Sequence, residues 1–171
     1  SLAQAALSKR GLYNLVLGTV AGTTIWHSFI NGPIAYKNLP RQQFGNLQSK
    51  LFPPFFALQT GGSALLLFMY SRANKLLRSD LNAWLLSGMG IVGLLNLTLV
   101  GPWTTKIMKR RHRLERLEGT TYDAPDAPPS SQMAALNKRF AIAHSVSSLL
   151  NLGFLGASVS LALLVGEYGL V

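Results

Sequence analysis

The stretch WHSFINGPIAYKNLPRQQFGNLQSKLFPPFF, residues Trp26–Phe56, decides the fold because it joins two apolar segments through a short basic connection. Asn31-Gly32-Pro33 is expected to end the first segment, since Gly accepts positive φ and Pro supplies no N–H to continue a helix. Pro40 then opens a second helix at its first position, where the missing N–H costs nothing. Pro53-Pro54 is expected to stop this helix and to start the next apolar segment.

The short helix predicted at about 40–52 is amphipathic. Phe44, Leu47 and Leu51 recur at helical spacing and share one face. We therefore predict an interfacial helix that lies on a membrane surface with these three side chains toward the acyl boundary or against the bundle. The residues predicted to meet lipid headgroups are Arg41 and Lys50 as cationic contacts, with Gln48 and Ser49 beside them.

Outside this stretch, apolar residues fall in blocks of about 20, the length that crosses a bilayer as a helix. The chain is 49% apolar and only 13% charged. It therefore predicts an all-α fold, a four-span transmembrane helical bundle that forms one integral membrane domain over residues 1–171. The predicted spans are about 11–31, 54–70, 81–100 and 146–167.

The region between the third and fourth spans divides into a basic helix and a loop. Residues 103–118 hold too many basic side chains to bury, so this helix is expected to be solvated or headgroup-associated, His112 included. Residues 119–131 are rich in Pro and Ser and predict a flexible loop. Ser130 or Ser131 is expected to cap a final helix from about Gln132 that projects from the membrane before it spans.

Three blocks of sequence carry a family resemblance. They are Trp26, Phe29, Leu39-Pro40-Arg41, Phe44-Gly45, Gln48–Pro53 and Phe56, then Asn96, Pro102, Thr104, Thr105 and Met108, then Phe140, His144, Ser147–Leu149 and Asn151–Gly153. In this order they resemble the transmembrane protein 205-like family of small polytopic membrane proteins of eukaryotes. The resemblance implies an architecture and brings no established catalytic residues.

The distribution of charge predicts the orientation. The first and third loops with their flanking helices hold eleven Lys and Arg residues, and the opposite side holds five. The positive-inside bias places loops one and three on the cytosolic or matrix side. Residues 1–79 contain no Asp or Glu, which suits a mitochondrial protein but equally any basic membrane protein. The organelle is therefore left open between a mitochondrial membrane and the endomembrane system. The first apolar block is as long as a full span and lacks a small-residue cleavage site, so no secretory signal peptide is expected.

Small and polar residues within the spans predict contacts between helices. Gly18 with Gly22, and Gly153 with Ala157, form small-residue faces, and further small residues stand at Gly61–Ala64 and at Gly88, Gly90 and Gly93. An amide in lipid needs a hydrogen-bond partner, so Asn96, His144 and Asn151 are predicted to make polar contacts between helices.

The sequence favours a non-enzymatic role, as an accessory or structural subunit or an interaction protein that packs against lipids and other integral membrane proteins. It has no cysteine, no paired intramembrane carboxylates and no nucleophile motif. No cofactor is expected, and no nucleic acid, because the net charge of +10 clusters beside apolar blocks. The alternatives are a small transporter or channel lined by Asn96, His144 and Asn151, and a haem-binding redox protein that uses His27 and His144.

Overall fold

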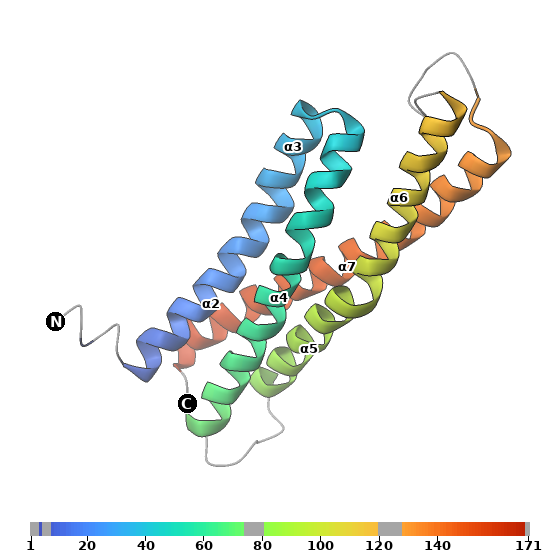
Figure 1. The fold of residues 1–171 in the computed structure, drawn as a ribbon. Coiled ribbons are helices and arrows are strands. Elements are labelled where there is room, and N and C mark those ends of the chain that lie inside the picture. The colour runs from blue at the N-terminus through green and yellow to red at the C-terminus, as the bar shows by residue number, and fades with distance from the viewer. Residues whose placement is uncertain (1–3, 5–7, 74–80, 120–127, 170–171) are drawn as a thin grey trace.

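The computed structural model describes Gln4 and residues 8–73, 81–119 and 128–169, and all elements assigned within these ranges are helical. Four long helical segments follow one another up and down the molecule, as Figure 1 shows. The start of α2 and the end of α7 lie at the same end (Figure 1). The segments are α2 (Lys9–Ile25) with η1 (Trp26–Asn31) and α3 (Gly32–Asn38), α4 (Arg41–Ala73), α5 (Leu81–Leu95) with η2 (Asn96–Val100) and α6 (Gly101–Glu118), and α7 (Ser131–Tyr168).

The packed core fills the half of the bundle in which α2, α4, α5 and α7 contact one another. Its largest buried side chains include Tyr13, Leu66, Leu86 and Phe154. Large apolar side chains also cover the outside of the helices, as a bilayer would require. Three helices are long and apolar enough to cross a membrane: Arg41–Arg72, Leu81–Glu118 and Ser131–Tyr168. The chain is an all-helical membrane protein.

The first helical segment does not end at Asn31-Gly32-Pro33, as the sequence suggested, but continues to Asn38. A π-helical turn, η1, precedes the Gly-Pro pair, and the N–H of Gly32 bonds to the carbonyl of His27. The wider turn accommodates the proline, whose ring would clash with a carbonyl of a regular α-helix. A second π-helical turn, η2, precedes Gly101-Pro102 in the same way. It joins the third span and the predicted basic helix into one continuous segment.

The predicted stop at Pro53-Pro54 is also wrong, because both prolines lie inside the 33-residue helix α4. Both are exposed. Membrane helices tolerate internal prolines where neighbouring groups satisfy the freed carbonyls. Residues 40–52 therefore do not form a separate short helix.

The first turns of α4 differ from the prediction at Gln48, which was expected beside the lipid headgroups but is buried. Gly45 and Gln48 are buried, whereas Leu47 is 36% exposed. Lipid accepts the exposed leucine because its hydrocarbon is as apolar as the side chain, so the small Gly45 and the polar Gln48 take the inward positions. The inward face of this segment is therefore partly polar.

The basic helix α6 is less solvated than predicted, since Arg111, His112 and Glu115 are buried. Arg111 tolerates burial because it donates to Asn137 and stacks on Phe140. Gly119, with a φ of 64°, ends α6, and the hydroxyl of Ser130 caps α7 by accepting from the N–H of Met133. Most of the predicted loop 119–131, namely residues 120–127, lies outside the described residues.

Candidate functional site

A cavity of about 700 Å³ lies at the end of the bundle away from the packed core. We call it the cleft. Its walls come from η1, α3 and the first half of α4 on one side, and from α6 and the first half of α7 on the other. In Figure 1 these are the α3–α4 hairpin and the α6–α7 pair in the upper part of the view.

Hydrogen-bonded amides close the bottom of the cleft. The amide nitrogen of Gln59 donates to Thr24 Oγ1 at 3.1 Å and to Asn151 Oδ1 at 2.8 Å. Asn151 in turn donates to Ser28 Oγ at 2.7 Å. Asn96 is fully buried nearby and accepts a hydrogen bond from Ser147 at 2.9 Å. These bonds tie α2, η1, α4, η2 and α7 together at one level.

Aromatic rings form the body of the cleft. The imidazole of His27 packs against Phe55, with 4.4 Å between ring centroids, and edge-on against Phe52. Phe52 stacks on Phe56 at 5.4 Å. Across the cavity, Phe140 stacks on His144 at 5.7 Å. The cleft therefore offers flat apolar surfaces between its polar bottom and its charged mouth.

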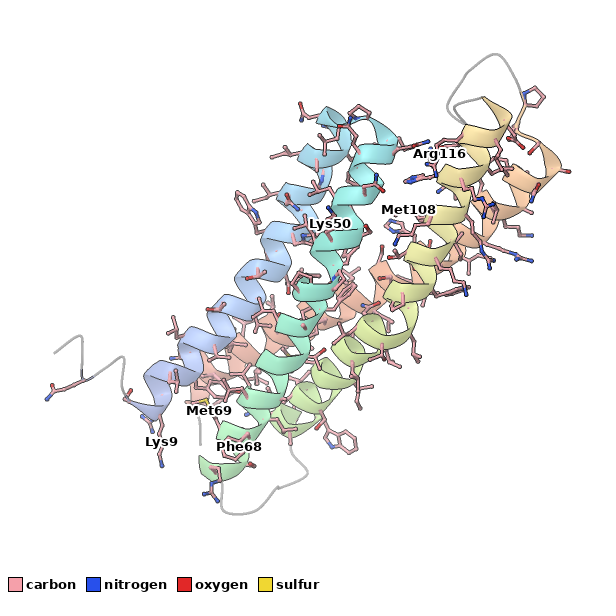
Figure 2. All side chains as sticks on the ribbon, in the orientation of Figure 1. Lys9, Lys50, Phe68, Met69, Met108 and Arg116 are labelled. Carbon is pink, nitrogen blue, oxygen red and sulfur yellow. The ribbon has the colours of Figure 1, made fainter. Side chains whose placement is uncertain are left out.

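Contacts between α4 and α6 narrow the mouth. Gln42 donates to Glu115 Oε2 at 2.9 Å and accepts from Arg116 at 3.4 Å. Gly45 is buried against α6, where a β-carbon would lie 2.7 Å from both Met108 Sδ and His112 Cε1. Figure 2 shows Met108 directed toward α4 and Arg116 beside the beginning of that helix.

One buried polar atom in the cleft has no partner. Gln48 lines the cavity with only 6% of its surface exposed, and no hydrogen bond reaches its Oε1 in the structure. A buried acceptor without a donor costs about 1–3 kcal/mol. A ligand hydroxyl or an ordered water in the cleft would recover that energy.

The structure brings some of the predicted site residues into the cleft and leaves others outside. His27, Arg41, His144 and Asn151 line it, while Lys50 is exposed elsewhere on α4. Asn96 and Asn151 make hydrogen bonds across helices. His27 and His144 share the cavity, although each ring is packed on a phenyl ring. His112, which the sequence suggested was solvated, is buried and lines the same cavity.

The glycines of the predicted small-residue faces lie away from the bundle. Gly18, Gly22 and Gly153 have no neighbouring atom within 4 Å of where a β-carbon would stand, while Ala157 packs at the edge of the core. Close helix contacts occur instead at Gly62, against Val20, and at Gly93, where a β-carbon would lie 3.1 Å from the backbone nitrogen of Thr60. Both glycines belong to small-residue groups noted in the sequence, but spacing alone did not identify the face that packs.

The three sequence blocks that carry the family resemblance converge on the cleft, since most of their residues line it. Sequence reasoning missed Gln59, Thr24 and Ser28, which complete its lower hydrogen bonds. A glutamine in the middle of an apolar segment was the available signal, because lipid offers it no partner.

Comparison with known proteins agrees with this architecture. A family described as a domain of unknown function (DUF4149) matches residues 15–113, from α2 into α6. The chain belongs to this family. Transmembrane protein 205 of Danio rerio is 38% identical over 60 residues, 35% of this chain and 32% of that protein. Xanthocillin biosynthesis cluster protein D of Aspergillus fumigatus is 40% identical over 47 residues, 28% of this chain and 30% of that protein.

The chain therefore matches about a third of the length of each of these relatives. The resemblance to the transmembrane protein 205-like family is confirmed. No solved structure matches the chain.

Proposed function

We propose that the protein is a non-enzymatic, four-span membrane protein that binds a lipid-like molecule in the cleft and acts as an interaction or accessory subunit in its membrane. The cavity itself carries the proposal. At about 700 Å³ it falls within the size range of small-molecule sites. It combines flat apolar walls with a few convergent polar groups, which is the usual composition of such sites.

The chemistry of the lining indicates an amphipathic ligand with a hydroxyl-bearing polar end. The phenyl rings of Phe52, Phe55 and Phe56 suit an apolar body. Gln48 Oε1, which has no partner in the structure, could accept a hydrogen bond from a ligand hydroxyl. Arg41 and Arg111 line the cavity while no carboxylate among the described residues does, so the surroundings favour a neutral or anionic headgroup.

The same lining supports a binding role over catalysis. Within the described residues, no histidine of the cleft is hydrogen-bonded to a serine or a carboxylate, as an activated nucleophile would require. The bond of the His27 ring is to the Asn31 amide, at 3.3 Å. The haem alternative, which would need His27 and His144, is checked by an absorption spectrum of the purified protein: a Soret band would replace this proposal.

Transport is the weaker alternative because the layer of hydrogen-bonded amides around Gln59 and Asn151 lies at the inner end of the cleft, where only Leu155 lines the cavity further in. Beyond that layer lie the apolar core side chains Tyr13, Leu66 and Phe154. A solute would need a polar path through them to reach the other face. The arrangement supports a site that is open at one end of the bundle.

The first helical segment supports the four-span arrangement. From Lys9 to Asn38 it is continuously helical, so at 1.5 Å per residue it is about 45 Å long, more than the hydrocarbon core requires. Its buried residues Tyr13, Leu17 and Val20 face the other three helices. The excess of basic residues near loops one and three supports a cytosolic or matrix position for the cleft.

Filling the cleft tests the proposal. Ser148 lines the cavity with its side chain exposed, whereas Ser145 is exposed one turn away and does not line it. We expect Ser148→Trp to block binding of a fluorescent dansyl fatty acid and to lower the lipid that co-purifies, since the indole occupies the cavity. Ser145→Trp is the matched control and is expected to bind as the unaltered protein does.

A measurement of stability is needed beside the binding assay. Equal thermal unfolding of both variants in detergent separates lost binding from lost folding. If Ser148→Trp and Ser145→Trp retain the same lipids and bind the probe equally well, the cleft is not a ligand site.

A further inference from the structure

Four basic side chains form a stripe on the outer side of α6. Lys106, Lys109, Arg110 and Arg113 stand at positions i, i+3, i+4 and i+7, so they share one helical face. All four are exposed. The face that contacts the rest of the protein is a different one, which includes Ile107, Met108 and Arg111. These four cations are therefore not part of the mouth of the cleft.

The stripe borders a second cavity, of about 600 Å³. Its opposite wall is the first half of α4, with Ser49, Phe52 and Phe56, and its lower wall is Leu97 of η2 with Pro102. We call it the basic groove. It is cationic along α6 and apolar below, at the point where the hydrophobic helix α5 gives way to the basic helix α6.

The positive charge of the basic groove is not neutralised within the part of the chain that the structure describes. There, Glu115 accepts from Gln42 and Glu118 accepts from Ser130. No ion pair or hydrogen bond in the described residues engages Lys106, Lys109, Arg110 or Arg113. Four like charges so close together repel one another, and an anion between them would relieve that repulsion.

We propose that the basic groove binds the headgroup of an anionic phospholipid of the surrounding bilayer. Its phosphate lies among Lys109, Arg110 and Arg113, and its acyl chains follow Phe52 and Leu97 toward the hydrocarbon. The apolar wall favours a lipid over a free phosphate ion, which would gain nothing from it. Juxtamembrane basic residues attract anionic lipids in this way. This site is separate from the cleft, although the two share a wall at Phe52 and Phe56.

The test is a lipid titration of the protein in an uncharged detergent, with native mass spectrometry as the readout. We expect phosphatidylglycerol to bind and phosphatidylcholine to bind much more weakly. Lys109→Gln with Arg113→Gln should weaken phosphatidylglycerol binding about 25-fold, because each basic residue beside an anionic lipid contributes about fivefold. Added salt should weaken the same interaction.

A matched control removes the same charge from another helix. Lys138 and Arg139 are exposed on α7 and line neither cavity, so Lys138→Gln with Arg139→Gln should leave the affinity unchanged. An equal loss in both double variants would show a general effect of net charge and overturn the site. Displacement of the lipid by inorganic phosphate or glycerol phosphate at similar concentrations would assign the groove to a soluble anion instead. Ser148→Trp, which fills the cleft, should leave the affinity for added phosphatidylglycerol unchanged, and this keeps the result independent of the cleft.

Discussion

Gln59 lies fully buried in α4, where its amide nitrogen donates to residues of two other helices. In an apolar environment an unpartnered amide is costly, so the amide holds α2 and α7 at fixed rotations. Asn151, which accepts one of these bonds, lines the cleft. Gln59 does not line the cleft itself, but its hydrogen bond fixes the position of Asn151, which does.

We expect Gln59→Leu to destabilise the protein by about 1–2 kcal/mol, because the nearly isosteric leucine removes both donors and leaves the Asn151 carbonyl without a partner. Thermal unfolding in detergent measures the change. Thr98→Val is the control, since Thr98 is exposed and its hydroxyl bonds only within its own helix. Identical unfolding temperatures for the two variants would show that the amide layer does not tie the helices together.

The sequence predicted some of the polar residues of the spans that make hydrogen bonds between helices, but not their partners. Asn96 and Asn151 were predictable as contacts between helices, because an amide inside an apolar segment has to find a partner. Their partners, Ser147 and Ser28, were not predictable. Which side chains meet depends on the rotation and depth of each helix, and these are set by packing against several neighbours at once.

At the scale of helices, two π-helical turns position the cleft. Each ends at a Gly-Pro pair, and in each the glycine N–H bonds to a carbonyl five residues earlier. In soluble proteins a Gly-Pro pair usually predicts the end of a helix. Here the helices continue as α3 and α6 and provide two walls of the cavity. The sequence predicted the order of the helical segments, but it did not predict these continuations.

Glycine is needed where the π-turn returns to an α-helix. A β-carbon on Gly101 would lie 2.5 Å from the carbonyl oxygen of Asn96, a backbone atom that cannot easily move away. We expect Gly101→Ala to cost about 1–3 kcal/mol through this overlap, despite the better helix propensity of alanine. Gly88→Ala has open space around it and should be neutral or slightly stabilising. A Gly101→Ala protein that unfolds no earlier than Gly88→Ala would mean that η2 is not formed.

For the whole molecule, the packed core and the two cavities lie in opposite halves of the bundle. The half that contains Lys9 and Phe68 in Figure 2 is filled by the apolar core, and the half that contains Met108 and Arg116 holds both cavities. Hydropathy predicted the apolar helices of the core half, but it did not predict α3 and gave no sign of the cleft. The cleft exists because the α3–α4 hairpin touches α6 at Gly45 without filling the space beneath that contact.

The number of spans is decided by whether the segment Lys9–Asn38 crosses the bilayer. The chain contains no cysteine, so single cysteines report sidedness without background. Arg10→Cys and Tyr168→Cys probe one end of the bundle, and Asn38→Cys and Gln132→Cys probe the other; all four positions are exposed. With four spans, an impermeant maleimide should label the first pair from one side of sealed vesicles and the second pair from the opposite side. The positive-inside bias puts the second pair on the cytosolic or matrix side. Labelling of Arg10→Cys and Asn38→Cys from the same side would show that Lys9–Asn38 does not cross the bilayer and that the protein has three spans. The wall of the cleft formed by η1 and α3 would then not be held within the membrane.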